Sequence, residues 1–373
     1  MSLSRASTAA LAGLACFAIV VYAFAEKSVT PVHAEAYRMK LKAVQIMERG
    51  ERAIAAAKHE RGVDVDSRND PYGYGVIGPQ FSLITTDRGS QRAKMLAAHP
   101  NFAAGITQLI LQAGVHAGDV VAVGVTGSLP GLNLAVYSAC QAIGARPVVI
   151  TSVGASMFGA NDPELTWLDM ETVLSEHSIT PFHSLAASLG GGGDVGRGLS
   201  PSGRQLILDA IERNHVRYLD ATNLLEAVRE RVALYDSVAN SLGKPIKLYI
   251  NVGGGLASLG GAQNGRLIPA GLTHRLAARN YPNRGVINVM AERRIPVIHL
   301  LQVNKLAREF DMGDGTTTPT PVGKGLLFIR YRYNLWIVGA AAMLVLLFNL
   351  FVLRLDLRQR LLGRPHPERM PSA

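Results

Sequence analysis

The sequence has 373 residues, 48% of them hydrophobic, and a formal net charge of +10. Residues 324–373 account for +6 of this charge, with eight Lys and Arg against Asp356 and Glu368. The basic excess therefore lies beside an apolar segment and does not form a surface for binding phosphates, so we predict no nucleic-acid partner. The two cysteines, Cys16 and Cys140, leave the globular part a single thiol, which excludes an internal disulfide there, but its length suffices for a large hydrophobic core.

The N-terminal segment is uncharged for 20 residues, from Ala6 to Ala25. A helix of this length crosses a hydrocarbon core of about 30 Å. Arg5 before the run and Ala23-Phe24-Ala25 at its end also satisfy the pattern of a cleavable signal peptide. We therefore predict that residues 1–30 are a transmembrane anchor or a signal peptide.

Residues 31–115 form a predicted helical lead-in region. Apolar residues recur at three- and four-residue spacing from His33 to Arg61, which predicts a long amphipathic helix. Residues 64–78 are rich in Gly, Pro and Asp and predict a loop, whose Asp spacing does not match a calcium loop. Two further helices are predicted at about 88–99 and 101–114.

Residues 116–310 carry the clearest alternation of strands and helices. A buried strand at 119–124, a helix at 132–143 and a second strand at 147–152 make a βαβ unit, which requires parallel strands. The alternation continues with strands near 184–188, 246–252 and 295–300 and with helices near 201–214, 222–241 and 302–310. We predict an α/β fold, a Rossmann-like open and mainly parallel sheet flanked by helices, with one transmembrane helix at each end of the chain.

The C-terminal part contains the second apolar run, 21 uncharged residues from Tyr333 to Leu353. Residues 311–332 predict a linker, 333–354 a transmembrane helix and 355–373 a basic cytoplasmic tail. Five Arg follow the run and three basic residues shortly precede it, a bias that places the tail inside the cell. The prediction is a two-pass protein of the plasma or inner membrane, held in the lipid bilayer, with its globular domain outside the cytoplasm.

Glycine-rich turns follow several predicted strands, at the sheet edge where α/β proteins bind ligands. Ser128 precedes Pro130 and a helix, so we expect its hydroxyl to cap that helix. These turns either shape tight connections or bind an anion or carboxylate, and neither a dinucleotide motif, a Walker lysine nor a nucleophile elbow fits their spacing. The candidate binding residues in these turns are Thr126, Gly127, Ser128, Arg197, Gly253 and Gly254.

A second polar cluster begins at Asn161. Asn161 or Asp162 is expected to cap a helix entered through Pro163, with Glu164 in its first turn. The alternative is that Asn161, Asp162 and Glu164 lie beside Ser128 and contribute to the ligand site. No H-E-x-x-H or C-x-x-C motif occurs, so we predict neither a metal nor a cofactor.

Four segments carry a resemblance to a known family: GDVVAVG at 118–124, GSLPGLN at 127–133, TSVGASMFGANDPELTWLDME at 151–171 and AASLGG at 186–191. They resemble the poly-gamma-glutamate system protein family. The resemblance implies a membrane-anchored accessory component of poly-γ-glutamate synthesis or export, with the polymer, the poly-γ-glutamate ligase and its membrane subunits as partners. It implies no catalytic residues.

Two classes of function follow from this sequence. The first is an accessory protein whose α/β domain binds the anionic polymer or a partner subunit. The second is an envelope enzyme, an amide hydrolase or transferase that acts on γ-linked polyglutamate at the glycine-lined crevice. A requirement for a nucleophilic side chain at Ser128 would distinguish the enzyme from the binding protein.

Overall fold

The computed structural model describes residues 8–63, 66–277, 280–313 and 320–362. The chain divides into two compact units, Met1–His33 with Ile329–Ala373, and Ala34–Phe328. The predicted basic tail lies largely outside the described residues, as do residues 1–7 and the middle of the predicted linker, 314–319.

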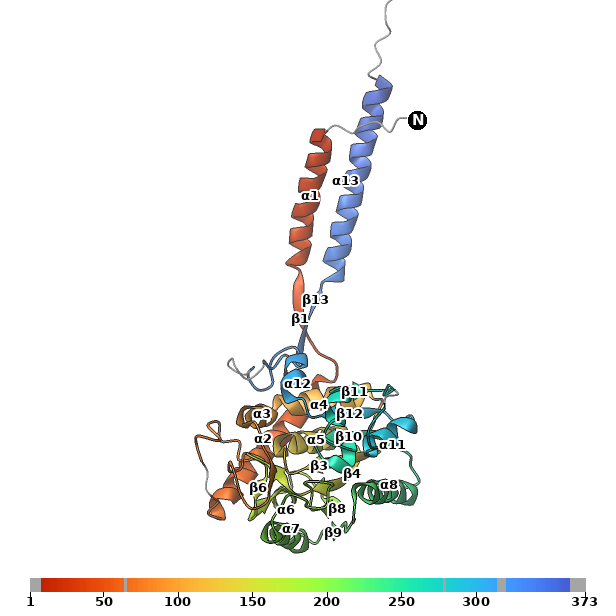
Figure 1. The fold of residues 1–373 in the computed structure, drawn as a ribbon. Coiled ribbons are helices and arrows are strands. Elements are labelled where there is room, and N and C mark those ends of the chain that lie inside the picture. The colour runs from red at the N-terminus through yellow and green to blue at the C-terminus, as the bar shows by residue number, and fades with distance from the viewer. Residues whose placement is uncertain (1–7, 64–65, 278–279, 314–319, 363–373) are drawn as a thin grey trace, which may run out of the picture. The chain divides into compact units, whose positions relative to one another are not determined.

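The first unit pairs the two ends of the chain. Helix α1 (Thr8–Glu26) leads into strand β1 (Val29–His33), and strand β13 (Ile329–Tyr333) leads into helix α13 (Leu335–Leu362). The strands are antiparallel, with Val29 opposite Tyr333 and His33 opposite Ile329 (Figure 1). The ring centroids of Phe17 and Phe348 lie 4.5 Å apart, so α1 and α13 pack against each other. The sequence analysis did not predict these strands: it assigned residues 329–332 of β13 to a linker and Tyr333 to the transmembrane helix.

Among the described residues, one helical segment is long and apolar enough to cross a membrane, Leu335–Arg354. It has 20 residues, and 6% of its most apolar window is buried inside the protein. This segment coincides with the predicted C-terminal span. The apolar helix Ala12–Glu26 is shorter, so an N-terminal span remains a prediction.

The second unit is an α/β domain built on a seven-stranded mixed sheet, as the alternation of strands and helices predicts. The strands follow the order β11-β12-β10-β3-β4-β8-β9, and all are parallel except the edge strand β11. Their bounds are β3 (Val120–Thr126), β4 (Arg146–Ser152), β8 (Ser184–Ser188), β9 (Arg217–Tyr218), β10 (Ile246–Val252), β11 (Gly271–Thr273) and β12 (Val297–Leu300). Strands β9 and β11 have two and three residues, too few to leave a pattern in the sequence.

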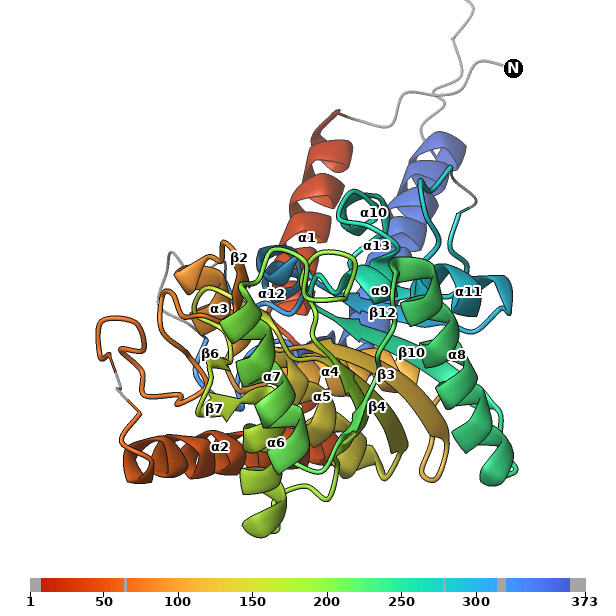
Figure 2. The ribbon, with the colours of Figure 1, turned by 60° about the horizontal axis from the view of Figure 1, so that its bottom comes forward.

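Helices cover both faces of this sheet, with α8 and α11 on one side of the central strands and α2 and α5 on the other (Figure 2). The helices that were predicted with explicit bounds lie within a few residues of those bounds. The helices are α2 (Tyr37–Glu60), α3 (Gln91–Ala97), α4 (Asn101–Gln112), α5 (Pro130–Ile143), α6 (Trp167–Glu176), α7 (Pro201–Arg213), α8 (Leu224–Ser241), α9 (Leu256–Leu259), α10 (Asn264–Leu267), α11 (Val286–Glu292) and α12 (Val303–Glu309).

The apolar run of β3 is continuous because the strand is buried on both faces, and every one of its residues is buried. Successive side chains of β3 point to opposite faces of the sheet. Those of Val120 and Ala122 belong to the hydrophobic core that also contains Tyr235 of α8. On the other face, α2 packs closely on α5 because residue 50 is a glycine, where a Cβ would stand 2.8 Å from Leu134 Cδ1. The predicted lead-in helix thus belongs to the same compact unit as the sheet.

Two short strand pairs lie beside the main sheet. Strand β2 (Thr85–Asp87) pairs in parallel with β5 (Ala155–Ser156), and β6 (Asn161–Asp162) pairs antiparallel with β7 (Leu165–Thr166). The second pair corrects the expectation of a helix after Pro163, because this stretch is a hairpin and α6 starts only at Trp167.

The helix cap predicted at Asn161 or Asp162 is therefore wrong. The cap of α6 is a capping box, in which the Thr166 N–H and hydroxyl both donate to Asp169 Oδ2 at 2.7 Å. Arg213 and Asn214 donate to the same carboxylate, and Arg213 is first among the partners that hold the pKa of Asp169 below its usual range against the effect of burial.

Candidate functional site

The carboxyl edge of the sheet has a reversal of strand order between β3 and β10, the position where open α/β sheets bind ligands. The two turns at this position touch each other. Gly253 has a positive φ of 86°, and a Cβ there would collide with Thr126 Oγ1. The Ser128 N–H donates to Thr126 Oγ1 at 3.3 Å. The structure thus brings together the predicted residues Thr126, Ser128 and Gly253.

Ser128 does not cap α5 as expected. The residue before this helix is Leu129, and no side chain caps it. Instead, Ser128 Oγ accepts a hydrogen bond of 3.0 Å from the N–H of Ser156, which lies in the short strand β5 just after the neighbouring strand β4. The hydroxyl therefore joins two turns of the carboxyl edge.

A buried lysine that the sequence analysis did not single out lies at this junction. Lys94, from α3, is 5% exposed, and its Nζ lies 2.8 Å from Ser156 Oγ and within hydrogen-bonding distance of the Ser128 carbonyl oxygen. Neither partner carries a charge, so neither offsets the desolvation of an ammonium, and burial lowers the pKa of Lys94 to about 7. The three residues form what we call the Lys94 cluster: Lys94, Ser128 and Ser156.

An ion pair is also buried at this edge of the sheet. Asp194 Oδ2 lies 2.7 Å from Arg231 Nη2, and the two side chains are 1% and 2% exposed. Ser152 Oγ donates to Asp194 Oδ1 at 2.7 Å, and Arg231 donates to Ser188 Oγ at 2.8 Å. Because these groups are buried and satisfy one another, they tie the polyglycine turn after β8 to helix α8 rather than present a ligand site.

The remaining predicted residues either hold loops in place or lie away from the Lys94 cluster. Gly127 accepts a 2.8 Å hydrogen bond from the Ala160 N–H, which brings the segment around Asn161 next to the glycine turn. Asn161 itself is fully buried, and its amide donates to the Pro79 carbonyl and to Thr85 Oγ1, both at 3.0 Å. Its role is therefore to hold a loop in place.

Asp162 and Glu164 do not face the Lys94 cluster. Asp162 Oδ1 accepts from the Glu164 N–H at 2.9 Å, and Asp162 lines a different groove of about 540 Å³. The Glu164 carbonyl accepts from exposed Arg61.

Arg197 and Gly254 also form no hydrogen bond or ion pair with Ser128 within the described ranges of the chain. Arg197 is exposed, and its carbonyl accepts from the Gly192 N–H at 2.9 Å. Gly254 is exposed beside Gly253, and a Cβ at this position would have Leu301 as its nearest neighbour, 3.9 Å away. The expectation of one pocket lined by all the predicted residues is therefore not met.

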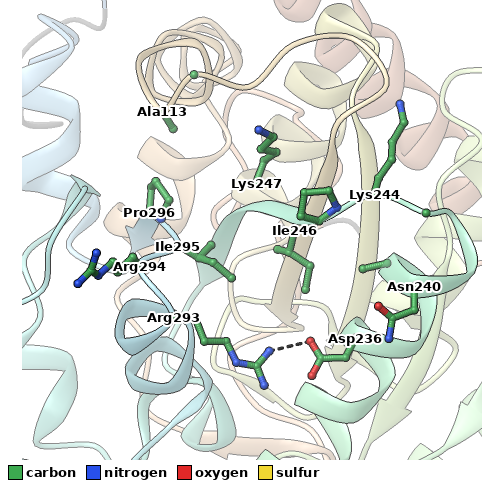
Figure 3. A pocket seen from close by; sticks show the side chains of 14 residues that line it. Ala113, Asp236, Asn240, Lys244, Ile246, Lys247, Arg293, Arg294, Ile295 and Pro296 are labelled. Atoms are coloured by element: carbon green, nitrogen blue, oxygen red, sulfur yellow. Dashed lines mark hydrogen bonds and ion pairs between the residues drawn. The ribbon is translucent and has the colours of Figure 1, made fainter.

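The opposite, amino edge of the sheet carries an open groove of about 890 Å³ (Figure 3). It lies between the end of α8, the start of β10 and the turn from α11 into β12. Four basic side chains and one acidic side chain line it, which makes it a basic groove: Lys244, Lys247, Arg293, Arg294 and Asp236.

The charges of the basic groove are only partly compensated. Arg293 pairs with Asp236 at 2.7 Å, and Lys244 Nζ donates to the Gly118 carbonyl at 2.9 Å. Lys247 and Arg294 are exposed and make no ion pair within the part of the chain that the structure describes. These two cations are available to an anionic ligand.

The sequence analysis did not predict the basic groove, because its basic residues come from two segments far apart in the chain. Lys244 and Lys247 flank the start of β10, and Arg293 and Arg294 follow α11 and precede β12. The available signal was similar in both segments: two basic residues lie close to the start of a buried parallel strand. Because neighbouring parallel strands begin at the same edge of the sheet, these four residues lie near one another.

Comparison with known proteins gives no relative for this chain: no protein-family model, no curated protein and no solved structure matches it at a significant level.

Proposed function

We propose that this protein is a membrane-anchored accessory component of poly-γ-glutamate synthesis or export, and that its α/β domain, Rossmann-like in its strand order, binds the anionic polymer. The observation that carries the proposal is the basic groove, with four cations against one carboxylate. Each residue of a γ-linked polyglutamate keeps one free carboxylate, so the polymer presents a row of negative charges that complements this surface. The resemblance of residues 151–171 to the poly-gamma-glutamate system protein family supports the choice of polymer.

Recognition in the basic groove would depend on several weak contacts. Lys247 and Arg294 are exposed, and an exposed ion pair contributes only about 0.2–1 kcal/mol. A polymer with repeated carboxylates can engage both cations at once, and the planar guanidinium of Arg294 can hold one carboxylate through two hydrogen bonds. Because these charges face solvent, binding should weaken strongly as the salt concentration rises.

The membrane anchors give the proposal its location. We propose that α1 spans the bilayer beside α13, so that the protein crosses the plasma or inner membrane twice with its α/β domain outside the cytoplasm. The pairing of β1 with β13 and the stacking of Phe17 on Phe348 support a helical hairpin. In this position the basic groove would meet the polymer as the ligase and its membrane subunits deliver it.

Polymer binding can be measured directly on the full-length protein in detergent micelles. Fluorescence anisotropy of labelled poly-γ-glutamate should show binding by the wild type, and Lys247→Glu with Arg294→Glu should weaken it on the order of tenfold, since two attractions become repulsions. The matched control reverses two exposed arginines outside the groove, Arg217→Glu with Arg308→Glu. Equal affinity of the two double variants would contradict the assignment of the groove.

The choice of pathway has its own test in cells. Deletion of the gene should lower the amount of cell-bound and released poly-γ-glutamate, and the wild-type gene should restore it. Polymer of unchanged amount and length in the deletion strain would contradict the proposed role, whatever the purified protein binds.

A further inference from the structure

The buried Lys94 is the least explained feature of the α/β domain. An ammonium group buried in a protein normally has a carboxylate partner, because its desolvation is otherwise uncompensated. Among the described residues, no carboxylate pairs with Lys94, and its hydrogen-bonding partners are the Ser128 carbonyl and the Ser156 hydroxyl. Such an environment favours the neutral amine, which carries a lone pair.

The hydrogen-bonding capacity of a neutral Lys94 matches these two partners. The Ser128 carbonyl oxygen can only accept, so it takes an N–H of Lys94 and thereby orients the amine. The Ser156 hydroxyl, 2.8 Å from Nζ, can donate its hydrogen to the nitrogen lone pair. A base within hydrogen-bonding distance of a hydroxyl, itself oriented by a third group, is the arrangement that activates a serine nucleophile.

The segment from Ser156 to Phe158 has two further properties of a reactive site. Ser156 is only half-buried, whereas the Lys94 side chain beside it is buried. Phe158, two residues later, has a positive φ of 61°, which is unusual for an aromatic residue and indicates a strained backbone. Hydrogen bonds from the Met157 N–H to Asp87 and from the Phe158 N–H to Pro79, of 3.0 and 2.9 Å, hold this conformation.

Other nucleophilic side chains near this edge are less suited to the role. The hydroxyls of Ser152 and Ser188 are buried in the network of Arg231, and the Ser128 hydroxyl accepts from the Ser156 N–H. Cys140 is buried, and burial raises the pKa of its thiol to about 12. Ser156 is therefore the hydroxyl that the geometry favours.

We propose that Ser156 is the nucleophile and Lys94 the general base of an acyl-transfer site, whose substrates are carboxylic amides or esters. This inference goes beyond the proposed polymer binding and does not depend on it. It moves the nucleophile from Ser128, the serine that the sequence singles out, to the residue whose hydroxyl touches the amine.

The reaction balances with water as the only co-reactant. In the first step, Ser156 Oγ attacks the carbonyl carbon of the substrate while Lys94 Nζ takes the hydroxyl proton, and a tetrahedral intermediate forms. In the second step, the C–N or C–O bond to the leaving group breaks, and the Lys94 ammonium protonates the leaving group. The acyl group is then an ester on Ser156. Water attacks this ester, Lys94 takes the proton of the water, and the ester bond breaks as that proton returns to Ser156 Oγ and the acid leaves.

Covalent labelling tests the assignment on the full-length protein in detergent micelles. A fluorophosphonate probe, which reacts with activated serines, should label the wild type, and peptide mass spectrometry should place the adduct on Ser156. Ser156→Ala should abolish the labelling, and Lys94→Met should slow it by about 10²–10⁴-fold, the usual contribution of a general base. The matched control is Ser237→Ala, an exposed serine of α8, which should label like the wild type.

A pH profile separates a base from a lysine that only supports the fold, and it needs no variant that could misfold. The labelling rate of the wild type should rise between about pH 6 and pH 8, as Lys94 loses its proton, and then level off. An adduct on another serine, a flat pH profile or no labelling of the folded wild type would each overturn the proposal. Ser156 does not line the basic groove, so Ser156→Ala should keep polymer binding while it loses labelling. This result would show that the acyl-transfer proposal and the polymer-binding proposal are tested independently.

Discussion

The buried pair of Arg231 and Asp194 gives a strong test of how the α/β domain is held together. Arg231→Met keeps most of the apolar stem but removes the guanidinium, which leaves the Asp194 carboxylate buried with the Ser152 hydroxyl still donating to it. Removal of one partner from a buried ion pair costs about 3–5 kcal/mol because the other charge stays desolvated. That is a large fraction of the roughly 5–15 kcal/mol by which domains are usually stable.

The magnitude can be set against an internal reference. Arg293 pairs with Asp236 at the same 2.7 Å separation, but its side chain is 40% exposed, whereas that of Arg231 is 2% exposed. Arg293→Met should therefore cost no more than about 1 kcal/mol. The two substitutions are chemically identical at the same ion-pair distance, so the difference between them measures burial.

Trp167 is a suitable reporter for this comparison. It is fully buried in the α/β domain, while Trp336 lies in α13, so a Trp336→Phe background leaves one tryptophan that reports unfolding of the domain. Urea unfolding of the full-length protein in detergent should show Arg231→Met less stable than Arg293→Met by about 2–4 kcal/mol. Adding Asp194→Asn should recover part of the loss, because no unpaired charge then remains. Equal stability of the two single variants would refute the argument.

Three further predictions concern other parts of the chain. Burial raises the pKa of Glu171 to about 7 from the ordinary 4.5, so the folded state binds more protons at this carboxyl than the unfolded state between these values, and the contribution of Glu171 to stability should fall as the pH rises through this window. Because the lowered pKa of Lys94 acts in the opposite sense above about pH 7, the Glu171 contribution is measured as the difference in unfolding free energy between the wild type and Glu171→Gln in urea at about pH 5 and pH 8. The wild type should lose stability relative to Glu171→Gln between these two pH values, and an unchanged difference would contradict the prediction. Gly105→Ala places a methyl group against the ring of Phe310 and should cost about 1–3 kcal/mol, measured in the same way; an unchanged stability would show that the ring moves aside freely. A reporter that is active only in the cytoplasm should work when fused after Ala373 and stay silent when inserted at Thr317, and the reverse pattern would place the α/β domain inside the cell.

The central strands could be predicted from the sequence because strands buried on both faces appear as runs of consecutive apolar residues. The Val-rich runs of β3 and β4 leave no other explanation for so many consecutive apolar residues, and the predicted bounds lie within two residues of the observed ones. In β13, by contrast, Arg330 and Arg332 alternate with exposed tyrosines, and its pairing depends on β1 at the other end of the chain. The residues around β13 do not indicate that it pairs with a strand at the other end of the chain.

The candidate sites were harder to predict than the fold for the same reason. A lysine in a short helix is expected to face solvent, and nothing near Lys94 in the sequence reveals that the turns after β3 and β4 enclose it. The wrong cap at Asn161 has a local cause, since Asp and Pro commonly start helices, but here a hairpin places Thr166 and Asp169 in that role instead.

The pairing of β1 with β13 also sets an order of events during synthesis. The Thr30 hydroxyl donates to the Arg332 carbonyl across 302 positions of the chain. At about 5–20 residues per second, roughly 15–60 seconds pass between translation of the first strand and of its partner. During that interval only part of the α/β domain is available to fold, because its last residues, up to Phe328, are translated just before β13. The hydrogen bond of 2.9 Å from the Ala34 N–H to the Phe328 carbonyl likewise forms only after Phe328 has been added. The N-terminal helix α1 is therefore synthesised long before its partner α13, and the pairing of the two strands is among the last steps of maturation.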